Sequence, residues 1–593
     1  MIYNSKDLKD MSNAVRALAL YALRSAHSGH LGIVLGAADI ITTVFANFLR
    51  RGRDKFVMSA GHGSALLYAV LRLAGYKIGD LRRFRKLGGL AGHPERGMDG
   101  IDVTTGPLGQ GVANAIGMAL AAKINHIDSN VFCLCSDGDL MEGVAQEAIA
   151  FAGRYKLNNL VLLWDDNGLS IDGTAQTDSD MLMRMVGAGW KVVSVDGNSF
   201  SQIGRALDSV KKSKMPVFVQ CKTVLGQGSK LENTSKAHGL ALSDSELGDL
   251  IQKFASQRGD ELWLDLVQRK MPIVENNEKK SLPHVTMQSV GGAMSTRELS
   301  GIYLNELLKA GAKIIGGSAD LGGSTNARVE NSQDITPGDF VGNYVNYGVR
   351  EHAMAAIMNG MAASGLCVYG STFLVFSDYM RPSIRLSALS GLPVVYVLTH
   401  DSVAVGEDGP THQPIEQLPS LRLIPNMNVF RPCNGIEVMY AWRRALLEKS
   451  RPSCIVLSRQ QIKMVPTPLG SELSRGAYVI YPSDSKRVRA TILATGSEVP
   501  LAIEVAKKLG NAVQVVSVLS VADFRKQDVE YKKQMLAGLV VAIEAAASAP
   551  WFEFADVVFG IDAFGASGDG MDVYQKFGFD ADIIVADIKN KIK

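Results

Sequence analysis

The chain has 593 residues, and its 62 Lys and Arg nearly balance its 59 Asp and Glu, for a formal net charge of +3. This balance excludes a general electrostatic field for nucleic acid or a membrane surface, but it leaves room for a local basic pocket for small phosphorylated ligands. The length is too great for one hydrophobic core and predicts three or four domains.

The N-terminal residues MIYNSKDLKDMS lack the apolar core of a secretory signal, so we expect a cytoplasmic protein. The apolar run 31–49 contains Asp39, whose charge would be costly in lipid, and we interpret it as a buried helix. The six cysteines form neither a disulfide framework nor a zinc-type spacing. Cys133 and Cys135 share one face of a predicted strand and lie too far apart along it to bridge each other.

Apolar, β-branched runs alternate with helical patterns along the whole chain. This alternation predicts an α/β fold in which mostly parallel sheets are flanked by helices. The predicted strands are 131–135, 160–167, 217–223, 394–401, 454–458, 490–496, 513–518 and 539–544.

Two breaks interrupt this pattern. The polar stretch around 276–294 lacks periodicity and contains a proline, so we interpret it as a linker. A weaker break follows residue 465. We therefore expect three α/β domains, at 1–275, 295–465 and 466–593.

Acidic residues follow the strand at 131–135 directly. Asp137, Asp139 and Glu142 lie within six residues, and Asn167 follows the next strand. Ligands of open parallel sheets bind beyond the carboxyl ends of the strands, where Asp137, Asn167 and a backbone carbonyl could form part of a magnesium shell. A strand-to-helix turn capped by Asp and an ordinary Asn-Gly turn would explain the same residues without a metal. The Walker motif of P-loop nucleotide sites is absent from the sequence.

Asp-Gly followed about thirty residues later by a strand ending in Asn resembles the metal and diphosphate motif of thiamine-diphosphate enzymes. SDGDLMEG and DDNGLSIDG resemble the transketolases specifically, and the resemblance runs over almost the whole chain. It is carried by SGHLG (28–32), SAGHGS (59–64), GHPE (92–95), TTGPLGQG (104–111), GVREH (348–352), GEDGPTHQ (406–413) and SRQ (458–460). The resemblance implies a thiamine-diphosphate-binding fold with a diphosphate-binding first domain and a pyrimidine-binding second domain.

The sequence departs from the family pattern at three points. Ser136 stands where the metal motif usually has glycine, and Leu31 where SGHPG has proline. The chain is also shorter than transketolases, chiefly around the linker. Because a serine can still turn at a strand end, we expect the metal site to be retained.

The resemblance implies that thiamine diphosphate and Mg²⁺ are the cofactors, with Ca²⁺ or another divalent ion able to substitute. The implied metal ligands are Asp137, Asn167 and the carbonyl of Leu169. The implied contacts to the rest of the cofactor are His62, Gly106, Pro107, Leu108, Gly138, Asn167, Ile171, His238 and Phe376.

Glu351 matches the family's acid beside the pyrimidine ring. A carboxyl there shares a proton with the ring nitrogen, and burial would raise its pKa to suit that task. A glutamate that merely stabilises a helix N-terminus would explain the residue without chemistry. Phe373, Phe376 and Tyr379 have a spacing that fits either an apolar wall around the ring or plain core.

Six of the ten histidines fall in matched blocks, and imidazole suits proton transfer among sugar hydroxyls near neutral pH. The resemblance implies that Glu351, His30 and His238 are catalytic, and that His30 and His238 exchange protons with the substrate. The implied substrate contacts are His30, His93, His238, Arg297, Ser324, His400, Asp408, His412 and Arg459. Of these, Ser324, Arg297, His400 and Arg459 would bind the distal phosphate, although either arginine alone could equally form a surface or interface salt bridge.

The implied reaction is the reversible transfer of a two-carbon ketol unit from a ketose phosphate such as xylulose 5-phosphate to an aldose phosphate such as ribose 5-phosphate or erythrose 4-phosphate. The family further implies a homodimer with active sites at the subunit interface, to which Glu142 would lie close. Three alternatives remain: a deoxyxylulose-phosphate synthase, a two-component ketoacid dehydrogenase, and a non-catalytic relative. The last is disfavoured because Glu351, Asp137 and Asn167 are all present.

Overall fold

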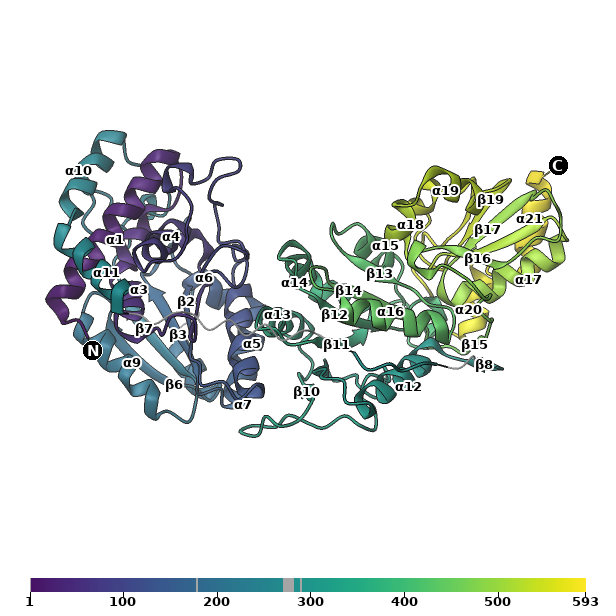
Figure 1. Ribbon diagram of the computed structural model, residues 1–593, viewed down its shortest axis with the longest axis horizontal. Coiled ribbons are helices and arrows are strands. Elements are labelled where there is room, and N and C mark those ends of the chain that lie inside the picture. Colours follow the sequence, from purple (N-terminus) through teal and green to yellow (C-terminus); the bar gives the residue numbers. More distant parts are fainter. Residues whose placement is uncertain (1, 178–179, 270–281, 288–290, 593) are drawn as a thin grey trace. The chain divides into compact units, whose positions relative to one another are not determined.

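The computed structural model describes residues 2–177, 180–269, 282–287 and 291–592 (Figure 1). Their internal contacts divide the chain into two compact units. The first unit is Met1–Glu278 with Thr336–Val341 and Ala356–Leu366, and the second is Lys279–Ile335 with Gly342–Ala355 and Cys367–Lys593.

A parallel five-stranded sheet forms the centre of the first unit (Figure 1). Phe132 and Leu134 of β2 point into a large core on one face, while Cys133 and Cys135 point to the opposite face. The strand order is β1 (Lys55–Met58), β2 (Val131–Ser136), β3 (Leu160–Asp166), β7 (Val217–Lys222) and β6 (Lys191–Asp196). β4 (Leu169–Ser170) and β5 (Gly173–Thr174) form a small hairpin after β3.

Helices cover both faces of this sheet. The core on the face of Phe132 contains side chains from α1 to α4 and from α9 to α11. α5, which lies outside that core, contacts β1, β2 and β3, and α7 packs against α5. The helices are α1 (Ser5–Ala26), α2 (Leu31–Gly36), α3 (Ala38–Thr43), α4 (Ser64–Leu73), α5 (Gln110–Ile124), α6 (Asp137–Met141), α7 (Gly143–Tyr155), α8 (Met181–Gly187), α9 (Phe200–Asp208), α10 (Asp244–Phe254) and α11 (Gln257–Arg269).

The segment 31–49 is buried as predicted, but the prediction of one continuous helix is wrong. α2 ends at Gly36, Ala37 has φ −92° and ψ 0°, and α3 is followed by a π-helical turn at Val44–Phe48. Asp39 pairs with Arg16 at 2.8 Å, and both side chains are at most 1% exposed. The break lets the chain turn while the buried carboxylate keeps its partner.

The second unit contains a six-stranded sheet and a five-stranded sheet. The six-stranded sheet is parallel, with the order β10 (Tyr344–Asn346), β9 (Gly316–Ser318), β11 (Val368–Phe373), β12 (Val394–Thr399), β14 (Ser453–Leu457) and β13 (Asn428–Phe430). The five-stranded sheet has the order β16 (Tyr478–Tyr481), β18 (Val513–Ser517), β17 (Ala490–Ala494), β19 (Leu539–Ile543) and β20 (Val557–Phe559). In it, β16 is antiparallel to its neighbour and the other pairs are parallel.

The remaining elements of the second unit connect and cover these sheets. β8 (Ala293–Met294) pairs with β15 (Ile462–Lys463) in a short antiparallel ladder. The helices are α12 (Thr296–Lys309), α13 (Glu351–Ala363, which continues into the first unit), α14 (Ser377–Leu389), α15 (Gln417–Arg422), α16 (Gly435–Leu447), α17 (Val499–Leu509), α18 (Val521–Arg525), α19 (Val529–Met535), α20 (Gly570–Lys576) and α21 (Ala581–Ile592).

The predicted fold class is confirmed, and each of the eight predicted strands is present. The three domain boundaries stay predictions, and residues 276–281 and 288–290 of the predicted linker lie outside the described residues. The six cysteines are free. Among the described helices, none combines the length and the apolar character that crossing a bilayer requires.

Candidate active site

The predicted metal ligands lie at one edge of the sheet in the first unit. Asp137 follows β2 and Asn167 follows β3, and these strands are neighbours. Asp137 is 4% exposed, and its Oδ1 accepts a 3.2 Å hydrogen bond from Nε1 of Trp164. Oδ1 of Asn167 accepts from the backbone amide of Leu169 at 3.1 Å. The sheet therefore brings oxygen ligands of the kind that Mg²⁺ prefers to one place.

Two carboxylates that sequence analysis did not assign, Asp165 and Asp166, end β3 beside this pair. Burial, followed by the negative charges of Asp166 and Asp165, raises the pKa of Asp137 to about 7. A bound cation would relieve this repulsion and favour the ionised carboxylate. In the described part of the chain no three His, Cys, Asp or Glu side chains are grouped to hold a metal. A metal here would thus need amide, carbonyl and ligand oxygens as well.

The other two acids of the opening motif have different surroundings. Asp139 is fully buried and accepts hydrogen bonds from Ser59 Oγ at 2.6 Å and from the backbone amides of Gly109 at 2.7 Å and Ser136 at 2.9 Å. Ser136, in the place of the usual glycine, caps α6 together with Asp139. Glu142 is exposed. Asp139 is therefore a structural acid that joins three loops.

Glycines allow the loops at this sheet edge to approach closely. A Cβ on Gly61 would lie 2.6 Å from the backbone nitrogen of Gly106, and one on Gly138 would lie 2.7 Å from Cδ1 of Leu108. Gly106 has φ +140°, which side chains disfavour. These contacts bring Gly106 to the GHG turn and Leu108 to Gly138, while Pro107 and Ile171 are exposed. The glycines therefore let the loops 59–64 and 104–111 approach each other and the turn at Gly138 without a side chain between them, which is compatible with a diphosphate contacting their backbone.

Four predicted histidines of the first unit form one cluster. The ring centroid of His30 lies 5.2 Å from that of His62, 5.7 Å from that of His238 and 6.3 Å from that of His93. Burial is the main cause that lowers all four pKa values, to about 4 for His30 and about 3 for His62. The cluster is therefore neutral at pH 7, able both to donate and to accept protons.

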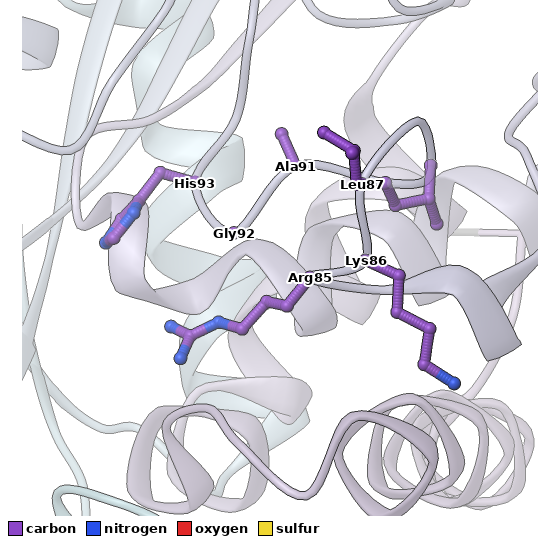
Figure 2. Close-up of a pocket in the computed structure, with 7 residues that line it drawn as sticks. Arg85, Lys86, Leu87, Ala91, Gly92 and His93 are labelled. Atoms are coloured by element: carbon purple, nitrogen blue, oxygen red, sulfur yellow. The ribbon is translucent and has the colours of Figure 1, made fainter.

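Arg85, which sequence analysis missed, contacts this cluster. Its Nη1 donates to Ser28 Oγ at 2.6 Å and its Nη2 lies 3.3 Å from Nδ1 of His30. An arginine can only donate, so Nδ1 of His30 accepts and Nε2 carries the ring proton. Figure 2 shows the side chains of Arg85 and His93 extending to the same side of an open pocket of about 480 Å³, while Lys86 extends elsewhere. No motif singled Arg85 out, because its role depends on contact across the fold.

Cationic residues of the predicted phosphate site converge in the second unit. Nη1 of Arg297 donates to the carbonyl of Ser324 at 2.5 Å, and its buried Nε lacks a partner among the described residues. Burial lowers the pKa of Arg297, and the charge of Arg459 lowers it further. Burial, then Arg297 and Arg459, lowers the pKa of His400 to about 3. The charges of Arg297 and Arg459 therefore act together on the neutral ring of His400, and an anion bound there would be stabilised by both arginines.

The remaining sugar-site residues lie on the loop after β12. His412 lies 5.3 Å from Phe376 between ring centroids, and Phe373 stacks on His400 at 3.7 Å. Asp408 is exposed near the tip of the loop. His400 itself has φ +64°, a strained backbone conformation that is often found at functional sites.

Glu351 is the first residue of α13, and burial is the main cause that raises its pKa. Both predicted features, the helix N-terminus and the raised pKa, are present in one residue. Phe376 stacks on Phe373 at 5.9 Å and lies 6.3 Å from Tyr379, whose side chain is 64% exposed. Phe373 is buried and Phe376 is half-buried, so this row of aromatic residues runs from the core to the surface.

The chain matches three family descriptions in order. They are "Transketolase, thiamine diphosphate binding domain" over residues 8–263, "Transketolase, pyrimidine binding domain" over 292–464 and "Transketolase-like TK C-terminal domain" over 476–580. Among curated relatives, the transketolase of Sinorhizobium medicae is 40% identical over 98% of this chain and 93% of its own length. That of Bacillus subtilis is 38% identical over 98% of both chains.

Solved structures agree over the same extent. The transketolase of Campylobacter jejuni superposes with a TM-score of 0.89 at 37% identity, covering 99% of this chain and all of that one. A Pichia stipitis transketolase in complex with sedoheptulose 7-phosphate gives a TM-score of 0.88 at 35% identity, covering 99% of this chain and 98% of that one.

Proposed function

We infer the roles of the site residues from one premise, which is that this chain belongs to the transketolase family. It is an enzyme that reversibly transfers a two-carbon ketol unit from a ketose phosphate to an aldose phosphate, as in the pentose phosphate pathway. The observation that carries the assignment of residues is Arg297, whose Nη1 donates to Ser324 and whose buried Nε lacks a partner among the described residues, and whose charge acts on His400 together with that of Arg459. This arrangement fits the distal phosphate of a sugar substrate, with Ser324 beside it.

Thiamine diphosphate is the cofactor that the matched domain binds, and it supplies the electron sink for breaking and forming the carbon–carbon bond. We propose that Asp137, Asn167 and the carbonyl of Leu169 hold Mg²⁺, with Ca²⁺ able to replace it. The mutual repulsion of the acids at this sheet edge supports a cation there. The remaining cofactor contacts would be His62, Gly106, Pro107, Leu108, Gly138, Ile171, His238 and Phe376.

Proton transfer would be divided between Glu351 and the histidines. Glu351 would share its proton with the pyrimidine ring, a task that its raised pKa favours. His30 presents Nε2–H because Arg85 occupies Nδ1, so His30 would donate to a substrate oxygen and His238 would exchange protons beside it. His93 and His412 would contact the hydroxymethyl end of the donor, and Asp408 a hydroxyl farther along the sugar.

We further propose a homodimer with active sites at the subunit interface. Each cofactor would be held by residues of the first unit of one chain and of the second unit of the other chain. Glu142 would lie near that interface, which its exposure permits. The cytoplasmic location stays a prediction.

The decisive experiment is a coupled assay with xylulose 5-phosphate and ribose 5-phosphate, with and without thiamine diphosphate. We expect cofactor-dependent turnover that falls by about 10²- to 10⁴-fold in Glu351→Gln, the usual contribution of general acid–base catalysis. Glu306→Gln on the exposed face of α12 is the matched control and should keep full activity. Undiminished turnover by Glu351→Gln would contradict the assignment of the acid. Release of carbon dioxide from pyruvate would favour a deoxyxylulose-phosphate synthase, and a requirement for a lipoyl partner would favour a ketoacid dehydrogenase.

A further inference from the structure

Tyr574 of α20 connects two stretches of chain that carry the proposed phosphate ligands. Its hydroxyl lies 2.9 Å from Ser402 Oγ and 3.4 Å from Gln460 Nε2. Ser402 is two residues from His400, and Gln460 is adjacent to Arg459. One phenol from near the end of the chain thus contacts a close sequence neighbour of each of two proposed phosphate ligands, His400 and Arg459.

The direction of each hydrogen bond follows from counting donors. The Tyr574 hydroxyl donates its one proton to Oε1 of Glu498 at 2.7 Å, and burial raises its pKa far above neutrality, so it stays protonated. Ser402 Oγ already accepts from the amide of Ala404 at 3.3 Å, which leaves its own proton for Tyr574. The amide of Gln460 also donates. The phenol oxygen therefore accepts two hydrogen bonds and donates one, which fills its capacity.

Glu498 is itself held in place, so the phenol has a rigid support. Its Oε2 accepts from Nη1 of Arg431 and from the amide of Ala545 at 3.1 Å. Nη2 of the same fully buried arginine donates to Oδ2 of Asp401 at 2.8 Å, and Asp401 is adjacent to His400. The network therefore runs from the C-terminal sheet to the strained backbone at His400.

A second contact from the same part of the chain supports the sugar loop 406–413. Nε2 of Gln413 donates to the carbonyls of Ala566 and Gly406, both at 2.9 Å. A Cβ on Gly565 would lie only 1.7 Å from Oε1 of Gln413. The loop with Asp408 and His412 is therefore packed directly against residues 565–566.

Arg459 links the two contacts, because its Nη1 donates to the carbonyl of Val405 at 3.1 Å. A shift of the turn between Ser402 and Gly406 would consequently move Arg459 and His400 together. Nothing in this arrangement places a side chain of 564–574 in contact with the reacting atoms.

We propose that the segment 564–574 is a positioning element for the sugar-phosphate site, in which Tyr574 fixes the relative placement of His400 and Arg459. This inference rests on the proposed function and deepens it, since it assigns the C-terminal region a part in phosphate recognition. A C-terminal region with a merely structural role would affect phosphorylated and unphosphorylated substrates equally.

The test compares Tyr574→Phe with wild type and with Tyr531→Phe. Tyr531 is a suitable control because its hydroxyl donates to the carbonyl of Ala477 at 2.6 Å, within the C-terminal sheet region and away from the phosphate residues. Tyr574→Phe removes the hydrogen bonds to Ser402, Gln460 and Glu498. With the cofactor-loaded enzyme, we expect this variant to raise KM for xylulose 5-phosphate about fivefold or more, since the loss of a single hydrogen bond corresponds to about fivefold, with kcat within twofold. KM for D-xylulose, which lacks the phosphate, should stay unchanged.

Calorimetric titration with ribose 5-phosphate supplies a readout without turnover, and its Kd should weaken by the same factor while that of D-ribose does not. Ser402→Ala removes the hydrogen bond between Ser402 and Tyr574 from the other side. It should raise KM for xylulose 5-phosphate and spare D-xylulose in the same way, and the double variant should be no worse than Tyr574→Phe alone. Should Tyr574→Phe not fold, Ser402→Ala decides the question alone.

Equal losses for phosphorylated and unphosphorylated sugars, an effect no larger than that of Tyr531→Phe, or additive losses in the double variant would overturn the proposal. A wild-type enzyme that binds ribose 5-phosphate but does not turn over sugar phosphates would instead refute the proposed function, and the titration would still decide the role of Tyr574.

Discussion

Replacing Arg431 with methionine should sharply destabilise the second unit. The guanidinium is fully buried and pairs with Asp401 at 2.8 Å and with Glu498, while Glu544 lies 3.7 Å away. Glu544 would keep its second partner, Arg422, at 2.7 Å. Asp401 and Glu498 would each lose their cation in a site that water does not reach.

The size of the effect follows from the cost of leaving buried carboxylates without their cation. Removing one partner of a buried ion pair typically costs about 3–5 kcal/mol, because the other charge is left without compensation. At about 2–4 °C for each kcal/mol in a large domain, the melting temperature should fall by roughly 10 °C. Thermal unfolding monitored by circular dichroism at pH 7.5 measures this shift.

Arg525→Met is the matched control, since Arg525 pairs with Glu553 on the surface, with side chains 36% and 43% exposed. Such exposed pairs contribute about 0–1 kcal/mol, so the control should melt within about 3 °C of wild type. If Arg431→Met melted as close to wild type as the control does, the view that this arginine neutralises the buried acids would be wrong.

Two other predictions concern the site itself. Burial lowers the pKa of His400 in the folded protein to about 3. Between about pH 6.5 and pH 3 this histidine is therefore protonated in the unfolded chain but not in the folded one. Stability should therefore fall as pH decreases from 6.5 toward 3, by about 2 kcal/mol at pH 5. His400→Gln should remove that part of the pH dependence of the melting temperature, and identical profiles for both proteins would refute the assignment. Removing divalent ions with EDTA should abolish turnover and Mg²⁺ should restore it. Asn167→Ala should need at least about tenfold more Mg²⁺ for half-maximal activity, and an unchanged requirement would exclude Asn167 as a ligand.

The regular part of the fold could be predicted from the sequence because buried parallel strands are continuous apolar runs. β2, β3, β7, β12 and β14 carry such runs and were all predicted. β9 and β10, with three residues each, and β6, with an exposed edge, lack them and were missed. Those strands exist because neighbouring strands supply hydrogen-bond partners, which is a tertiary effect that a local pattern does not contain.

The residues of the candidate site fall into the same two groups, those marked by a local sequence pattern and those that depend on tertiary contacts. Asp137, Asn167 and Glu351 could be located because strand ends and helix starts are local features that carry motifs. Arg85 reaches His30 from 55 residues away, and Tyr574 reaches Ser402 from 172 residues away. Neither residue belongs to a motif. Each acts through a hydrogen bond to a residue that is distant in the sequence and becomes a neighbour only when the chain folds. The three-dimensional structure was therefore required to find the residues that hold the chemical groups in place. The Tyr574 and Ser402 variants test whether sugar-phosphate recognition depends on the positions of His400 and Arg459 that these residues maintain.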